Sequence, residues 1–200
     1  MLSIDGLKTF IIKMKDNNKK LILLDLDNTL ICAEDLTSVR DESKMVTARE
    51  KFRTVRMEDY YDIFERPHLQ EFLDYLFDNF NVGVWTASSK DYAVFVVKNF
   101  ITQPENKLIL DRKIQIFLCS HHCNVSKKHF KGVTKDLKLL SEKWNLKELK
   151  DILLIDDLEV LAEHQPNNVI SIKPFFYDKE GAYEDKELIN IKESLKNIIK

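Results

Sequence analysis

Four consecutive apolar residues, Leu21–Leu24, are followed directly by a segment with two carboxylates, Asp25 and Asp27. An apolar run of this length after the polar stretch 16–20 is typical of a strand that is buried on both faces of a sheet. Asp, Asn and Thr also favour turns, so a turn or a helix cap is the alternative interpretation. That alternative does not explain why the acids follow a buried run. The apolar run and the two acids after it therefore predict a sheet-based fold with polar side chains at the end of a strand.

The same kind of apolar run recurs along the chain and alternates with segments of helical spacing. Apolar runs predict further strands at 82–85, 114–118, 152–155 and 169–172. Apolar residues three and four positions apart predict helices that begin at Pro67 and after Ser88 or Ser89, and helices over 135–144 and 184–199. The alternation predicts an α/β fold, with a three-layer α/β/α, Rossmann-like parallel sheet.

The length of 200 residues, of which 44% are hydrophobic, suits a single domain over residues 1–200. We expect its core over about residues 20–200, after an N-terminal extension over 1–19. The stretch 31–65 is charged and weakly patterned, and we expect it to be an insertion with little core of its own. Within it, apolar residues could anchor a hairpin: Phe52, Val55 and Ile63.

The charges nearly cancel, with 31 basic against 33 acidic residues and a net charge of -2, so no strong nucleic-acid binding is expected. Three cysteines do not make a disulfide framework, and they fit reduced thiols in the cytoplasm or nucleus. We expect no signal peptide, no transmembrane segment and no membrane partner, because no apolar stretch approaches the roughly 20 residues that a span needs.

Three of the predicted strands end in polar side chains: Asp25 and Asp27, then Thr86, then Asp156 and Asp157. The carboxyl ends of parallel strands lie at one edge of a sheet, and ligands bind there in open α/β folds. A helix cap at Thr86 and a solvated loop at Asp156 are the structural alternatives. Adjacent acids after a buried strand are unfavourable unless a cation offsets their repulsion, which favours a functional site.

The segment that begins at Asp25 resembles the first motif of the haloacid dehalogenase superfamily, Asp-Leu-Asp-x-Thr-Leu. Three further segments resemble its other motifs in the same order: 85–88, 135–137 and 155–157. The segments 66–73 and 166–175 resemble the FCP/SCP-like phosphatases, which act on the C-terminal domain of RNA polymerase II. The resemblance runs from about Lys20 to near the C-terminus, and it implies a haloacid dehalogenase-like fold without a large cap domain.

This resemblance implies a role for each matched residue. Asp25 would be the nucleophile that forms an aspartyl-phosphate, and Asp27 would be the general acid and base. Thr86 and the backbone N–H of Ala87 would bind phosphoryl oxygens. Lys135 would neutralise the phosphoryl charge and hold Asp25 in place.

The resemblance also implies Mg²⁺ as the cofactor. Its ligands would be Asp25, the backbone carbonyl of Asp27, and Asp156. Asp157 would contact the ion through a water molecule or support one of its ligands. Magnesium takes about six oxygen ligands and keeps several waters, so few protein groups are needed.

The segment Cys119-Ser120-His121-His122-Cys123 departs from the family, because Ser120 stands where relatives often have arginine. The residues after Asp157, Leu158 and Glu159, replace a frequent Ser-Pro. Both departures bear on substrate preference. The Cys/His cluster, with His129 nearby, also suggests a zinc site, but its spacing matches no common zinc pattern, and we favour a strand end and loop beside the active site.

The expected function is a magnesium-dependent protein Ser/Thr phosphatase whose partner is a phosphoprotein or phosphopeptide, with the RNA polymerase II C-terminal domain as one candidate. Neither 31–65 nor the stretch between Thr86 and Lys135 has the apolar content of an independent helical cap, so an open site is expected. The alternatives are a nucleic-acid 3′-phosphatase or a small-metabolite phosphatase of the same superfamily. A non-catalytic phosphopeptide-binding module is a third interpretation, which the complete set of acids disfavours.

Overall fold

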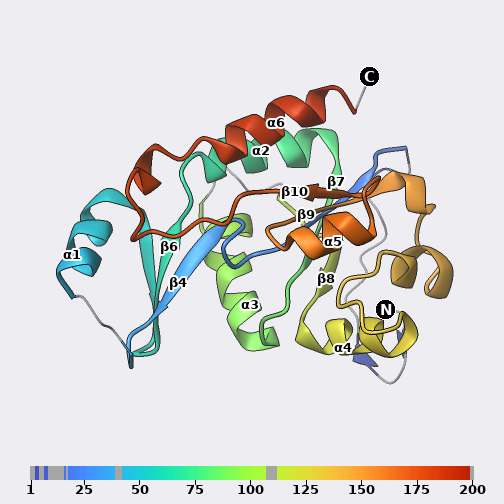
Figure 1. The fold of residues 1–200 in the computed structure, drawn as a ribbon, viewed down its shortest axis with the longest axis horizontal. Helices are drawn as coiled ribbons and strands as arrows, with labels where there is room; N and C mark the ends of the chain where they lie inside the picture. The colour runs from blue at the N-terminus through green and yellow to red at the C-terminus, as the bar shows by residue number, and fades with distance from the viewer. Residues whose placement is uncertain are drawn as a thin grey trace.

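The computed structural model is built around a five-stranded parallel sheet with the strand order β10-β9-β3-β7-β8 (Figure 1). It describes residues 3–4, 7–8, 16, 18–38, 42–106 and 112–198. The strands of this sheet are β3 (Leu21–Leu24), β7 (Asn81–Trp85), β8 (Ile116–Leu118), β9 (Ile152–Asp156) and β10 (Val169–Ser171). Each coincides with an apolar run that predicted a strand, so the α/β fold is confirmed.

Helices cover both faces of the sheet and complete the three layers. On one face lie α2 (Leu69–Asn79), α3 (Lys90–Val96), η1 (Val97–Thr102) and α6 (Glu187–Lys196). On the other face lie α4 (Ser120–His129), η3 (Leu139–Lys143) and α5 (Glu159–His164). Ile22 and Leu24 belong to the first core and Leu21 and Leu23 to the second, which is why this run is apolar throughout.

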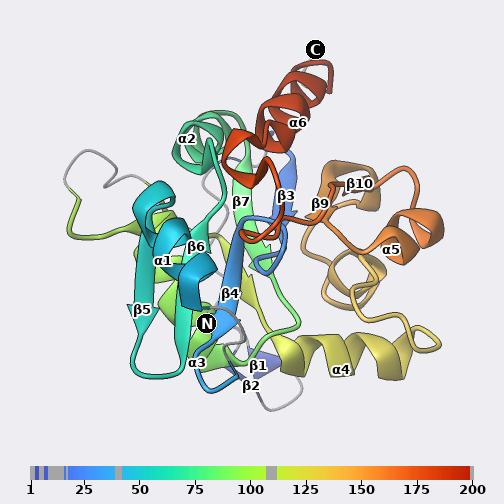
Figure 2. The same ribbon diagram turned by 60° about the vertical axis from the view of Figure 1, so that its left-hand side comes forward.

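The helices on the first face follow the sequence pattern closely. In α2, the side chains of Leu69, Phe72 and Leu76 are buried against the sheet, and α6 packs beside α2 (Figures 1 and 2). Ser89 caps α3, because its Oγ accepts a hydrogen bond from the backbone N–H of Tyr92 at 3.4 Å. The helix predicted over 184–199 is shorter in the structure, where α6 spans Glu187–Lys196 and the single turn η5 (Ala182–Glu184) precedes it. Residue 199 lies outside the described residues.

Two predictions on the second face differ from the structure. The helix predicted from Lys135 begins later, at η3, because side chains bind the backbone of residues 133–137 instead. The segment 119–123 is the start of a helix, α4, and not a strand end and loop. Hydropathy does not reveal α4, because its buried stripe contains His122 and Ser126, which count as polar.

The insertion forms a small antiparallel sheet of its own, in the order β4-β6-β5, with a helix beside it (Figure 2). Its elements are β4 (Ile31–Asp35), α1 (Glu42–Lys51), β5 (Thr54–Met57) and β6 (Tyr61–Glu65). Val55 pairs with Ile63, so the predicted hairpin is confirmed. The insertion has more core than expected, because Phe52 and Phe64 are buried with Phe175, which comes from the distant C-terminal part of the chain.

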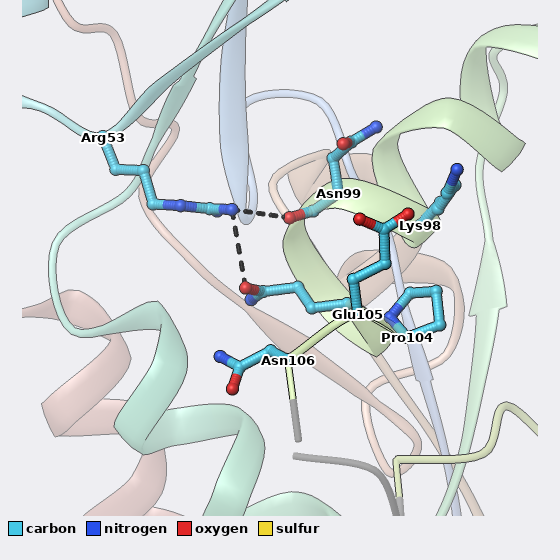
Figure 3. A pocket seen from close by; sticks show the side chains of 7 residues that line it. Arg53, Lys98, Asn99, Pro104, Glu105 and Asn106 are labelled. Atoms are coloured by element: carbon cyan, nitrogen blue, oxygen red, sulfur yellow. Dashed lines mark hydrogen bonds between the residues drawn. The ribbon is translucent and has the colours of Figure 1, made fainter. Parts of the chain in front are cut away.

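Arg53 ties this insertion to the main sheet domain. Its guanidinium donates hydrogen bonds to Glu65 Oε2 at 2.6 Å, to the carbonyl of Asn99 at 2.8 Å and to Gln103 Oε1 at 3.5 Å. Figure 3 shows the bond to Asn99. The pocket that Arg53 helps to line has a volume of about 360 Å³. The described residues that line this pocket include none of the predicted catalytic residues. Arg53 therefore anchors the inserted sheet to η1.

The N-terminal extension contains one short antiparallel pair, β1 (Ser3–Ile4) and β2 (Leu7–Lys8). A further turn, η4 (Leu149–Asp151), precedes β9. Within the described ranges, no helix combines the length and the apolar character that crossing a membrane requires.

Candidate active site

The central strand β3 places Asp25 at the carboxyl edge of the sheet, between the ends of β7 and β9. Leu24 pairs with Val84 on one side and with Ile155 on the other. The backbone N–H of Asp25 donates to the carbonyl of Ile155 at 3.0 Å, so Asp25 continues the strand and lies beside Asp156. The parallel register therefore brings together strand ends that the sequence separates widely.

Lys135 joins two of the predicted acids directly. Its Nζ donates to Asp25 Oδ1 at 2.7 Å and to Asp156 Oδ2 at 2.6 Å, and all three side chains are buried. Burial raises the pKa of Asp25 to about 7, against the lowering effect of Lys135 and together with the negative charge of Asp156. Burial opposes the charged form of Lys135, but the two carboxylates outweigh it and raise the pKa of this ammonium.

Three carboxylates form the group best suited to a cation among the described residues. Asp25, Asp156 and Asp157 each offer an oxygen, and these oxygens all lie within 4.8 Å of one another. Burial and the charge of Asp156 raise the pKa of Asp157, whose Oδ1 accepts a hydrogen bond from the hydroxyl of Thr29 at 3.2 Å. Hard oxygen donors in this number fit Mg²⁺, which would relieve the repulsion among buried acids. The structure groups Asp157 with the ligand candidates themselves.

The carboxylate of Asp27 is held by hydroxyl groups near the start of α3. Ser88 Oγ donates to Asp27 Oδ2 at 2.5 Å, and the hydroxyl of Tyr92 donates to Oδ1 at 2.6 Å. Burial and the charge of Asp27 raise the pKa of Tyr92, so its hydroxyl keeps its proton. Neither Ser88 nor Tyr92 was expected in the site from the sequence, although Ser88 lies inside the second motif.

Thr86 follows β7 and is buried at the same edge. Its backbone N–H donates to the carbonyl of Leu118 at 3.0 Å, and its Oγ1 accepts from the N–H of Ser88 at 3.1 Å. The thiol of Cys123, in the first turns of α4, donates to the carbonyl of Thr86 at 3.5 Å. Ala87 is exposed in the loop between Thr86 and Ser88. α4 thus supports the loop that was predicted to bind phosphate.

A pocket of about 450 Å³ opens beside Asp27. One wall consists of Ser88 and Tyr92, and the inserted sheet contributes Met57 and Tyr61 to the other. The rings of Tyr61 and Tyr92 meet edge to face with centroids 5.5 Å apart. Sequence reasoning missed these insertion residues, because the segment shows no periodic pattern. The pocket offers a largely apolar surface directly next to a candidate acid–base group.

Arg66 joins the two distant segments that carry the family resemblance, 66–73 and 166–175. Its buried guanidinium donates to the carbonyl of Thr29 at 2.9 Å, to that of Lys173 at 2.8 Å and to both oxygens of Asp185. The N–H of Phe175 donates to the carbonyl of Asn28 at 2.7 Å. The two segments therefore meet around the loop that follows Asp27 and hold it in place.

The fold is of the haloacid dehalogenase type: a parallel α/β sheet whose central strand places Asp25 beside Lys135 and Asp156. The family model described as NLI interacting factor-like phosphatase matches residues 20–200. The chain belongs to this family of FCP-type phosphatases, which confirms the resemblance drawn from the sequence.

Two viral proteins are similar over nearly their whole length. The CTD phosphatase-like protein 355R of Invertebrate iridescent virus 3 is 68% identical over 182 residues, which cover 91% of this chain and 98% of that protein. Its namesake in Invertebrate iridescent virus 6 is 44% identical over 180 residues, 88% of this chain and 97% of that protein.

A solved structure supports the fold. The structure of Fcp1, described as an essential RNA polymerase II CTD phosphatase, matches with a TM-score of 0.52 and 22% identity. The match covers 90% of this chain and 51% of the Fcp1 chain, so this chain corresponds to about half of the Fcp1 chain.

Proposed function

We propose that this protein is a Mg²⁺-dependent phosphatase that removes phosphate from phosphoserine or phosphothreonine in a peptide, through an aspartyl-phosphate on Asp25. The observation that carries the proposal is the buried contact of Lys135 with both Asp25 and Asp156. A nucleophilic carboxylate needs a nearby positive charge, because it must approach a phosphate that is itself negative.

The two aspartates of the first motif then have separate roles. Lys135 binds Asp25 through Oδ1, which leaves Oδ2 of the same carboxylate for attack on phosphorus. Asp27 is held by Ser88 and Tyr92, and it would protonate the leaving oxygen and later accept a proton from the hydrolytic water. Thr86 and the N–H of Ala87 would bind phosphoryl oxygens at the same edge.

Asp25, Asp156 and Asp157, together with the backbone carbonyl of Asp27, would hold Mg²⁺. When bound, the ion masks the negative charge of the phosphoryl group. The protein's own contribution is the placement of these acids, which Lys135 and Thr29 hold by hydrogen bonds.

A peptide substrate is favoured by the pocket beside Asp27. The inserted sheet is anchored by Arg53 and forms one wall of that pocket, where Met57 and Tyr61 offer apolar surface to residues that flank the phosphate. Extended, proline-containing peptides suit such a surface because their conformation is largely preformed. The relatives' names, CTD phosphatase-like, agree with this class, and we extend the proposal to the RNA polymerase II C-terminal domain.

The three cysteines are all free and buried, which fits a reducing compartment such as the cytoplasm or nucleus.

The test compares the wild-type protein and Asp25→Asn on three substrates: a phosphorylated heptad peptide, a 3′-phosphorylated oligonucleotide and a sugar phosphate. With Mg²⁺, the wild type is expected to prefer the peptide. Asp25→Asn conserves shape but removes the nucleophile, so kcat should fall by at least about 10⁴-fold. Removal of metal by a chelator should abolish turnover, and Mg²⁺ should restore it.

Asp59→Asn, at an exposed position in the β5–β6 turn, is the matched control and should leave kcat unchanged. Turnover that survives in Asp25→Asn or after thorough chelation contradicts the mechanism. Preference for the oligonucleotide or the sugar phosphate would leave the chemistry in place but reject the peptide as substrate.

A further inference from the structure

Lys135 lies in a segment without regular secondary structure, residues 133–137, between α4 and η3. A lysine side chain has four rotatable bonds and loses considerable conformational entropy when it is fixed. Its ammonium can stay between Asp25 and Asp156 only if the backbone of this segment is itself held in place. The segment belongs to no strand or helix, so its backbone groups need hydrogen-bond partners from elsewhere in the protein.

Gln165, which directly follows α5, supplies part of the answer. Its Oε1 accepts a hydrogen bond from the backbone N–H of Leu137 at 2.8 Å, and its Nε2 donates to the carbonyl of Lys135 at 3.0 Å. A backbone N–H can only donate and a carbonyl can only accept, so these partners determine the orientation of the amide. One side chain thus binds the backbone on both sides of Asp136.

Ser126, in α4, holds the same segment from another element. Its buried Oγ accepts from the N–H of Asp136 at 3.0 Å and donates to the carbonyl of Val133 at 2.8 Å. Together, Gln165 and Ser126 satisfy four backbone groups within five residues. They replace the ladder of hydrogen bonds that a neighbouring strand would provide.

We propose that Gln165 is a positioning residue for Lys135: with Ser126, it fixes the backbone of 133–137 so that the ammonium binds Asp25 and Asp156 together. The inference rests on the proposed function, because it gives Gln165 an effect on turnover through Lys135. Gln165 itself contacts the backbone of the segment and not the carboxylates. An amide is suited to this position because it carries one donor and one acceptor group without a charge.

Asn168 provides a matched control three residues further along the same loop. Its Nδ2 donates to the carbonyls of Leu149 and Ile152, at 2.7 Å and 2.8 Å. It therefore makes the same number of side-chain bonds to backbone, both as a donor, but to a different part of the chain. A general loss of structure would affect both variants, whereas loss of Lys135 positioning would affect only the Gln165 variant.

The experiment compares Gln165→Met and Asn168→Leu, which nearly conserve volume and remove these bonds. Steady-state kinetics are measured with 4-nitrophenyl phosphate and Mg²⁺, and amide hydrogen exchange by mass spectrometry. Gln165→Met should lower kcat about 10- to 100-fold, because a displacement on the order of 1 Å of a catalytic group has this effect. Its KM should change less than about threefold. Exchange should become faster within 133–137.

Asn168→Leu should keep kcat within about threefold of the wild type. In this variant, faster amide exchange should be confined to the region around Leu149 and Ile152, the partners of Asn168. Ser126→Ala should act in the same direction as Gln165→Met. In a Lys135→Ala background, Gln165→Met should cause no further loss of kcat, because both changes act through one group.

An unchanged kcat in Gln165→Met overturns the inference, as do equal losses in Gln165→Met and Asn168→Leu or additive losses in the Lys135→Ala background. Failure of the proposed function is recognised separately, by a wild-type protein without turnover. The exchange measurement does not need turnover and decides the inference in that case. Faster exchange within 133–137 in Gln165→Met supports it, and unchanged exchange there rejects it.

Discussion

The carboxylate of Asp27 is oriented by two hydroxyl groups, from Ser88 and Tyr92, at 2.5 Å and 2.6 Å. We expect Tyr92→Phe to weaken general acid catalysis, because it removes one of these bonds while conserving the ring. The loss in kcat should be about 10- to 100-fold for a phosphoserine peptide, whose leaving alkoxide needs a proton. It should be less than about threefold for 4-nitrophenyl phosphate, whose leaving group departs without one.

Tyr75→Phe is the control for this prediction. The hydroxyl of Tyr75 has no hydrogen-bond partner among the described residues, so its removal should change neither rate. An equal loss of kcat on both substrates in Tyr92→Phe would mean that Tyr92 supports the fold and not proton transfer by Asp27.

At the scale of elements, the inserted sheet decides what lies next to the catalytic carboxylates. Met57, at the end of β5, contributes to the pocket that contains Asp27. Met57→Ala should lower kcat/KM for a phosphopeptide about 10-fold, because the apolar contact with flanking residues is lost. Turnover of 4-nitrophenyl phosphate, which has no flanking residues, should stay within about twofold.

Tyr60→Ala, in the exposed turn of the same hairpin, should leave both substrates unaffected. If Met57→Ala affects neither substrate, the peptide does not use this pocket. Parallel losses on both substrates would instead indicate that the insertion shapes the catalytic edge itself.

At the scale of the whole molecule, Arg66 connects the loop after Asp27 with the C-terminal part of the chain. Its guanidinium is fully buried and pairs with Asp185 at 2.9 Å. We expect Arg66→Met to lower the free energy of unfolding by about 3 kcal/mol, because Asp185 and two carbonyls lose their donor inside the protein. Urea denaturation followed by circular dichroism would measure this loss.

Arg56→Met is the matched comparison, because Arg56 also pairs with a buried aspartate, Asp62, but its side chain is 52% exposed. Asp62 keeps Arg49 as a partner, so the loss should stay below about 1 kcal/mol. Equal losses of unfolding free energy in the two variants would show that the buried Arg66–Asp185 pair stabilises the protein no more than the more exposed Arg56–Asp62 pair.

The strands of the central sheet and the main candidate residues could be predicted from sequence patterns alone. A strand buried on both faces must be apolar at every position, so Leu21–Leu24 is recognisable without knowledge of its neighbours. The acids that follow the strands were recognisable by their order along the chain. Patterns of this kind are local, so hydropathy and residue spacing are sufficient to recognise them.

The contacts among these residues depend on how distant segments pack, which sequence patterns do not show. Lys135 contacts Asp25 across 110 positions, and Tyr92 contacts Asp27 across 65, and such contacts leave no periodic trace. The grouping of Asp157 with the other acids depends on side-chain direction, which strand assignment does not supply. Local patterns follow from the geometry of helices and strands, whereas hydrogen-bond partners are chosen when distant segments pack together.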